Sequence, residues 1–156
     1  MSMKTFFAVL ATAAVAAVPA GAQDYRLDPT YTTLTLDSGF APDPQTIELQ
    51  SGGDIDASSI SSSCRGFIAN APDVRVRYTR GRYPLIISVD SNADTTLVVN
   101  APDGRWYCDD DSGERGLNPM VRFNNPQSGQ YDIWVGTYGN ARLEPATLAI
   151  SEISSQ

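Results

Sequence analysis

Apolar and polar residues alternate along much of the chain with the two-residue period of strands that bury one face. In residues 74–78, two valines and a tyrosine share one face and two arginines share the other. Similar alternation, or a short apolar run of strand length, occurs at 33–36, 46–50, 85–89, 95–99, 120–123, 131–135 and 147–150. Each segment has the length of a strand and is too short for a typical helix.

Turn-forming residues separate these segments, with Pro-Asp or Gly-Gly pairs at 42–44, 52–53, 72–73 and 102–104. No helical pattern of ten or more residues occurs after residue 22. The pattern predicts an all-β fold: a single antiparallel β-sandwich of jelly-roll type over residues 23–156, with eight to ten short strands. The Ser-rich stretch 54–63 is predicted to be a mobile surface loop.

The first 22 residues have the three parts of a secretory signal peptide. Lys4 is followed by an apolar run at 5–18 and by the small residues Ala20, Gly21 and Ala22. The run is shorter than the ~20 residues that a membrane helix needs, so we expect no membrane insertion. The small residues predict cleavage after Ala22, and the alternative is an uncleaved amphipathic N-terminal helix. The mature protein is expected in the periplasm, outside the cell or at the cell surface.

Export makes a disulfide between Cys64 and Cys108 the expected state of the only two cysteines. The alternative is two free thiols, but the sequence places no histidine or lysine near them to lower a thiol pKa. A Cys64–Cys108 bond would tie the Ser-rich stretch to the sheet.

Charge and composition exclude several functions. The chain has 11 Lys+Arg against 18 Asp+Glu, a net charge of −7, which argues against nucleic acid as a partner. The absence of histidine excludes Ser-His and Cys-His nucleophile pairs and His-ligated transition metals. We therefore expect no enzymatic activity. An aspartic-type hydrolase is the alternative, because Asp-Ser-Gly occurs at 37–39 and at 111–113.

Two acidic loops suggest a calcium site, because Ca²⁺ prefers carboxylate and carbonyl oxygens. Three consecutive aspartates begin at Asp109, and an Asp-x-Asn-x-Asp pattern begins at Asp90. Asp94 comes just before one predicted strand, and Asp109 comes at the end of the next. If these two strands pair in antiparallel fashion, both loops lie at one end of the sandwich. The alternative is a solvated acidic rim. The expected ligands are Asp90, Asn92, Asp94, Asp109, Asp110 and Asp111.

Aromatic residues near the second cysteine and after the 131–135 segment could form a stacking surface for a glycan. Trp106 and Tyr138 are the candidates for such a face. The alternative is that these aromatic side chains belong to the core, with Trp106 packed near the disulfide.

Residues 85–150 resemble the bacterial pre-peptidase C-terminal (PPC) domain. The resemblance rests on an Asp that opens an apolar strand at 94, a Pro-Asp-Gly turn at 102–104, an acidic Asp-Asp-x-Gly loop at 110–113 and the Ser-Gly-x-Tyr-x-Ile-x-Val strand at 128–135. It implies a secreted jelly-roll module that assists hydrolases without catalysing, with calcium in acidic loops. The matching acidic residues are Asp94, Asp109, Asp110 and Asp111. Residues 24–83 have no counterpart in the resemblance.

These observations together predict a secreted, non-catalytic binding or structural module stabilised by calcium. Its partner would be an unidentified secreted or cell-surface protein or glycan. A carbohydrate-binding module and an accessory partner of a secreted peptidase are the alternatives.

Overall fold

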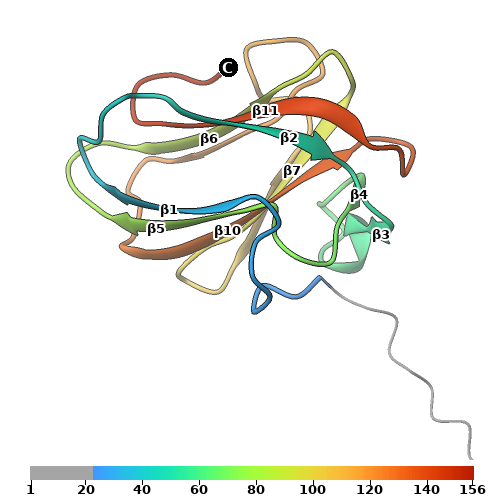
Figure 1. Ribbon diagram of the computed structural model, residues 1–156, viewed down its shortest axis with the longest axis horizontal. Coiled ribbons are helices and arrows are strands. Elements are labelled where there is room, and N and C mark those ends of the chain that lie inside the picture. Colours follow the sequence, from blue (N-terminus) through green and yellow to red (C-terminus); the bar gives the residue numbers. More distant parts are fainter. Residues whose placement is uncertain (1–22) are drawn as a thin grey trace, which may run out of the picture.

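The computed structural model describes residues 23–156, whose strands lie in two layers (Figure 1). The predicted signal peptide at 1–22 lies outside these residues. The strands are β1 (Thr32–Asp37), β2 (Gln45–Ser51), β3 (Ile55–Asp56), β4 (Phe67–Ile68), β5 (Val74–Thr79), β6 (Leu85–Asp90), β7 (Thr95–Asn100), β8 (Trp106–Asp109), β9 (Met120–Phe123), β10 (Gly129–Thr137) and β11 (Glu144–Ser151). The 3₁₀ turn η1 (Ala57–Ser59) follows β3.

Eight of these strands form the predicted jelly roll. Sheet B has the order β2-β11-β6-β9, and sheet A contains β5-β10-β7-β8. Every pairing among these eight strands is antiparallel. The first and last jelly-roll strands, β2 and β11, pair with each other, as do β5 and β10, which is the closure expected of a jelly roll. The all-β sandwich predicted from the alternation is thus confirmed.

Three strands are added to this framework. β1 pairs with the edge of β5 in parallel, with Thr32 opposite Val74, whereas the sequence predicts only antiparallel pairs. β3 and β4, of two residues each, lie between β2 and β5 in the chain and join sheet A at the end of β10, where Phe67 pairs with Thr137. The alternation rule misses such strands because two residues are too few to show a period.

The main core lies between the two sheets. It is filled by alternate residues of the facing strands, such as Leu97 of β7, Ile133 of β10 and Ile87 of β6, all fully buried. Tyr131 of β10 also points into this core. Trp134, three residues further along β10, is also buried but lies on the opposite face of the strand.

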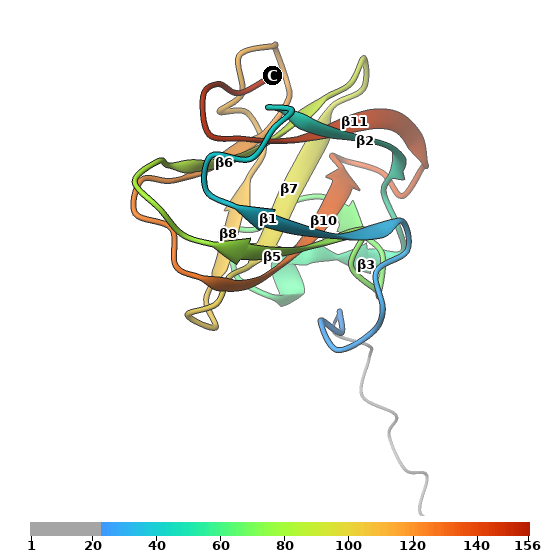
Figure 2. The ribbon, with the colours of Figure 1, turned by 60° about the vertical axis from the view of Figure 1, so that its left-hand side comes forward.

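A second core lies on the outer face of sheet A. Its buried members are Ala57, Cys64, Ile68, Val98 and Trp134. The segment that contains β3, η1 and β4 covers this face, and Figure 2 shows it on the side of sheet A away from β2 and β11. The prediction of a mobile loop at 54–63 is therefore wrong, because Ala57 is fully buried within it.

The predicted disulfide is confirmed. Cys64 and Cys108 are bonded, with their Cα atoms 5.1 Å apart, and no free cysteine occurs in residues 23–156. The bond joins β8 to the cover segment, which is the segment from β3 to β4 (residues 55–68), and so closes the second core. A disulfide of this kind persists in oxidising compartments, which supports export of the protein.

A buried arginine anchors the chain ahead of β1. The Nη2 atom of Arg75 donates to the carbonyl oxygens of Tyr25 and Leu27, at 2.6 and 2.9 Å. Within residues 23–156 no helix has both the length and the apolar character that crossing a membrane requires.

Candidate functional site

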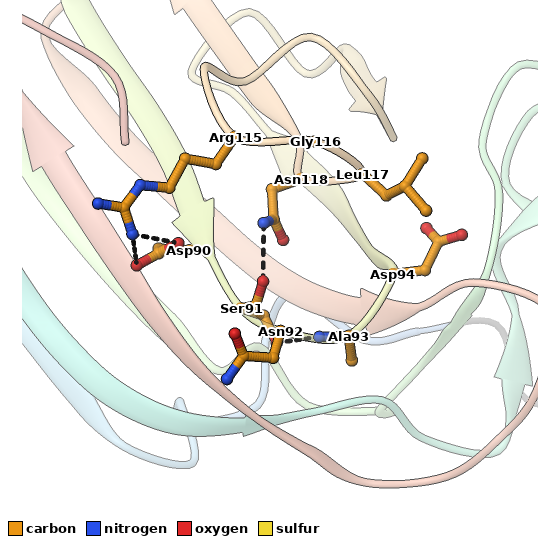
Figure 3. A pocket seen from close by; sticks show the side chains of 9 residues that line it. All are labelled: Asp90, Ser91, Asn92, Ala93, Asp94, Arg115, Gly116, Leu117 and Asn118. Atoms are coloured by element: carbon orange, nitrogen blue, oxygen red, sulfur yellow. Dashed lines mark hydrogen bonds and ion pairs between the residues drawn. The ribbon is translucent and has the colours of Figure 1, made fainter.

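The acidic loops predicted from the sequence lie at one end of the sandwich, which we call the acidic end (residues 91–94, 110–118 and 138). The antiparallel β7–β8 hairpin places Asp109 opposite Leu97, so the residues after Asp109 extend toward the loop before β7. A cavity of about 350 Å³ opens here between the β6–β7 loop and the β8–β9 connection (Figure 3). Its lining residues are Asp90, Ser91, Asn92, Ala93, Asp94, Arg115, Gly116, Leu117 and Asn118.

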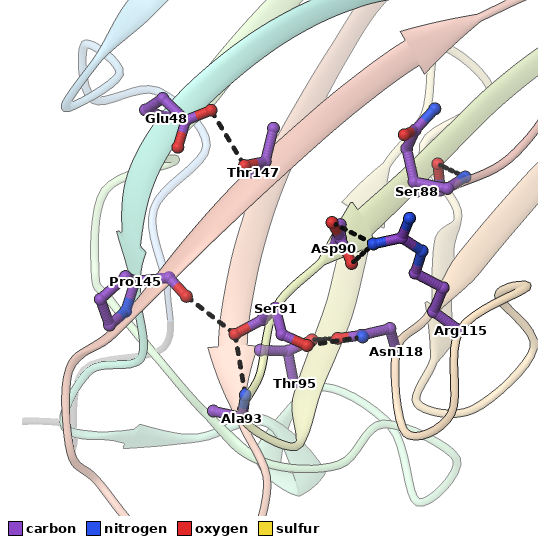
Figure 4. A network of polar contacts seen from close by, with 11 residues as sticks. Glu48, Ser88, Asp90, Ser91, Ala93, Thr95, Arg115, Asn118, Pro145 and Thr147 are labelled. Carbon is purple, nitrogen blue, oxygen red and sulfur yellow. Dashed lines mark hydrogen bonds and ion pairs between the residues drawn. The ribbon is translucent and has the colours of Figure 1, made fainter.

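The buried side chain of Asn118 holds the two loops together. Its Nδ2 donates to the carbonyl oxygen of Ser91 at 2.9 Å, and its Oδ1 accepts from the hydroxyl of Thr95 at 2.8 Å. The Ser91 hydroxyl donates in turn to the Pro145 carbonyl at 2.8 Å, which ties the β6–β7 loop to β11 (Figure 4). The floor of the cavity is therefore fixed by polar contacts from three segments.

Two of the six expected calcium ligands are engaged by protein groups. Asp90 forms an ion pair with Arg115, at 3.1 Å between Oδ2 and Nη1. Asp109 accepts hydrogen bonds from the amides of Ser112 and Met120, at 2.8 and 2.9 Å, and from the Ser112 hydroxyl. Asp109 thus acts as a turn-stabilising residue at the start of the loop.

The carboxylate of Asp94 interacts electrostatically with the other acidic loop, at 109–111. Burial raises the pKa of Asp94, and the nearby carboxylates of Asp111 and Asp110 raise it further. Figure 3 shows the Asp94 carboxylate beside Leu117, on the far side of Asn118 from Asp90. The six expected ligands are therefore divided: Asp94, Asp110 and Asp111 lie near one another, Asp90 and Asp109 are engaged by other protein groups, and Asn92 lines the cavity.

The side chains as they stand do not make a calcium site. Within the described part of the chain, no group of three or more Asp, Glu, Cys or His side chains is arranged to hold a metal ion. Calcium binding would require the loops to bring Asp94, Asp110 and Asp111 around a common point, and it stays a prediction.

Two exposed residues are joined to the backbone at 94–95, and one of them, Leu117, was not identified from the sequence as a site residue. The amide of Thr95 donates to the Leu117 carbonyl at 3.2 Å, and the amide of Tyr138 donates to the Asp94 carbonyl at 2.9 Å. Leu117 is 56% exposed and Tyr138 is 45% exposed. A single leucine in a loop carries no sequence signal, and only the backbone bond to Thr95 places it here.

The two aromatic residues considered for one ligand face lie at opposite ends of the molecule. Trp106 pairs with Asn100 at the far end of β7, whereas the amide of Tyr138 donates a hydrogen bond to Asp94, the residue before β7. Trp106 is half-buried, with its ring centroid 5.4 Å from that of Trp134 and 6.5 Å from that of Tyr25. The expectation that Trp106 packs near the disulfide is confirmed, since it contacts the second core.

The two Asp-Ser-Gly triplets are also separated. Asp37 ends β1 opposite Thr79, at the end of sheet A where β10 begins. Asp111 lies beyond β8 at the acidic end, where β10 finishes. The carboxyl dyad of an aspartic hydrolase therefore does not form from Asp37 and Asp111.

No known family model matches this chain, and no curated protein matches it. Among solved structures, the chain is similar to PliG of Aeromonas hydrophila, a periplasmic lysozyme inhibitor of g-type lysozyme. The two are 15% identical over 77% of this chain and 96% of that chain, with a TM-score of 0.42. This degree of likeness does not establish a common fold, so the proposals below rest on the geometry of this chain alone.

Proposed function

We propose that the protein is an exported, non-catalytic binding module that holds a basic protein partner at its acidic end. The observation that carries the proposal is that two exposed residues, Leu117 and Tyr138, are held next to residues 94–95 by backbone hydrogen bonds, Leu117 to Thr95 and Tyr138 to Asp94. Tyrosine is enriched among the residues that dominate binding at protein interfaces, and an exposed leucine near it adds apolar area that a partner can bury.

The negative charge around Leu117 and Tyr138 favours a partner with a positively charged surface. Asp110 and Asp111 lie close enough to raise the pKa of Asp94, so negative charge is concentrated beside Leu117 and Tyr138. The whole chain has a net charge of −7. Such a surface attracts a positively charged protein and repels an acidic one, and it accelerates association at low salt.

The location of the partner follows from the disulfide. Because the Cys64–Cys108 bond favours an oxidising compartment, the partner is a periplasmic, secreted or cell-surface protein. If the chain functions as PPC domains do, the partner would be a secreted peptidase, which would bind at the same surface.

Capture with matched variants tests the proposal. Immobilised wild-type protein, Leu117→Ser and Tyr138→Ser are exposed to the exported proteins of the producing cells, and bound proteins are identified by mass spectrometry. Ile153→Ser and Tyr83→Ser are the controls, because these residues are 76% and 47% exposed but line a different pocket, together with Gly39 and Glu152. We expect a basic protein to be captured by wild type and both controls and lost with both acidic-end variants. Equal capture by all five proteins would refute the proposal.

A further inference from the structure

A second cavity lies at the end of sheet A opposite the acidic end. It has a volume of about 500 Å³, within the range of roughly 300–1,000 Å³ that is usual for ligand pockets. It opens between the segment before β1, the β7–β8 hairpin and the start of β10. The residues that matter for the inference are Tyr25, Asn100, Trp106, Gln130 and Asp132.

One wall of this cavity is aromatic and held in place. Trp106 stands opposite Asn100 in the β7–β8 ladder, and its indole ring packs against that of Trp134 at a centroid distance of 5.4 Å. Tyr25 approaches the Trp106 ring edge-on at 6.5 Å, and its carbonyl is fixed by Arg75. Trp106 is half-buried and lines the cavity.

Polar residues that carry little net charge lie beside Trp106 on the same face of sheet A, where Asn100 pairs with Trp106 on one side and with Asp132 on the other. The Nε2 of exposed Gln130 donates to Asp132 Oδ2 at 2.8 Å, and the Nδ2 of Asn100 donates to the Arg105 carbonyl at 3.5 Å. The negative charge of Asp132 is balanced by Arg75, whose Nε lies 2.6 Å from Oδ1. A charged ligand therefore gains no ion pair here, whereas a neutral ligand with hydroxyl groups finds the side-chain amides of Gln130 and Asn100, which both donate and accept hydrogen bonds.

We propose that this cavity binds a neutral saccharide, with the apolar face of a pyranose ring on Trp106 and its hydroxyls bonded to Gln130 and Asn100. A flat aromatic surface beside hydrogen-bonding amides matches a pyranose ring, which presents C–H groups on a face and hydroxyls around its rim. The proposal goes beyond the protein-binding role, because the two sites lie at opposite ends of β7.

Titration of the disulfide-bonded protein with cellotriose, chitotriose and mannotriose tests this inference. Binding is followed by tryptophan emission, which comes from only Trp106 and Trp134, and by calorimetry. We expect saturable binding of at least one trisaccharide. Trp106→Ala should weaken that binding by roughly tenfold or more, and Gln130→Ala should weaken it several-fold.

Two further variants keep the result interpretable. Trp106→Phe retains an aromatic ring and should retain measurable binding even if Trp106→Ala disturbs the second core. Gln50→Ala removes an exposed glutamine from sheet B and should bind as wild type does. The inference is overturned if none of the three sugars binds saturably, or if Gln130→Ala and the Trp106 variants all bind like wild type.

Discussion

Arg75 and Asp132 form a buried ion pair on the outer face of sheet A, with 2.6 Å between Nε and Oδ1. The two residues are directly opposite in the β5–β10 ladder. Arg75 also holds the carbonyls of Tyr25 and Leu27, so one guanidinium joins the sheet to the segment before β1.

Replacing Arg75 should be costly, because it leaves the Asp132 carboxylate buried without a cation. We expect Arg75→Met to lower the free energy of unfolding by about 3–5 kcal/mol. Arg77→Met is the matched control, since Arg77 lies on the same strand but is exposed, and it should change stability by less than about 0.5 kcal/mol. Chemical denaturation measures both, and equal losses in the two variants would contradict the role assigned to Arg75.

The alternation of residues 74–78 correctly predicted a strand but not the environment of Arg75. The pattern assigned both arginines to a solvent-facing side, and Arg77 does lie there. Arg75 is 7% exposed because the chain before β1 folds over it. That segment has no strand or helix period, so its path could not be deduced from the sequence.

The second core was missed for a related reason. Serines dominate residues 54–63, and the few apolar residues among them, Ile55, Ala57 and Ile60, are spaced first by two and then by three positions, so they sustain neither the strand period nor the helix period. The disulfide and Trp134 on the outer face of β10 were the available signals that something must cover sheet A.

The position of the acidic end was largely predictable, but its chemistry was not. Antiparallel pairing of β7 and β8 brings Asp94 toward Asp110 and Asp111, as the sequence indicated. The sequence could not show that Arg115 would pair with Asp90, or that Asp109 would accept hydrogen bonds from Ser112 and Met120. Both depend on the path of the β8–β9 connection.

Loss of the disulfide should release the cover of the second core. Cys64→Ser combined with Cys108→Ser frees a loop with a sequence separation of 44 residues, and we expect a loss of up to roughly 4 kcal/mol in the free energy of unfolding. Trp134 should become more accessible, which shifts its emission to longer wavelength. Unchanged stability and emission would show that the cover segment holds without the bond.

Asp73 should make stability depend on pH. Burial raises the pKa of Asp73 to about 7, although the Val135 amide, which donates to its Oδ2 at 2.7 Å, partly opposes the shift. The unfolded chain, with its Asp pKa of 3.8, loses this proton first. The folded state is therefore favoured most at low pH, and the contribution is lost as pH rises from about 4 to about 7.

Asp73→Asn should flatten this part of the stability profile, because asparagine keeps an acceptor for Val135 and does not ionise. The difference from wild type is bounded by roughly 4 kcal/mol, since each pKa unit corresponds to about 1.4 kcal/mol. Denaturant midpoints between pH 4 and pH 8 provide the measurement. Asp28→Asn, an exposed residue, is the control and should leave the slope unchanged. Parallel profiles for all three proteins would show that Asp73 ionises normally.

Calcium binding stays a prediction, and the structure separates Asp90 from the other expected aspartate ligands Asp94, Asp110 and Asp111. If calcium binds, calorimetric titration of metal-stripped protein should show heat that is lost in Asp94→Asn, Asp110→Asn and Asp111→Asn. Asp90→Asn should bind as wild type does, because Asp90 is already paired with Arg115. Absence of heat, together with an unchanged melting temperature on adding calcium, would rule out the calcium site.

The central claim is that the acidic end contacts a protein partner through the surface around Tyr138. Site-specific photo-crosslinking from position 138 tests it most directly, with benzoylphenylalanine in place of Tyr138 in one protein and of Tyr83, a similarly exposed tyrosine near the other end, in a second. Illumination in the exported fraction should give a discrete adduct with a basic protein from position 138 and none from position 83. An adduct formed only from position 83, or none from position 138, would contradict the claim.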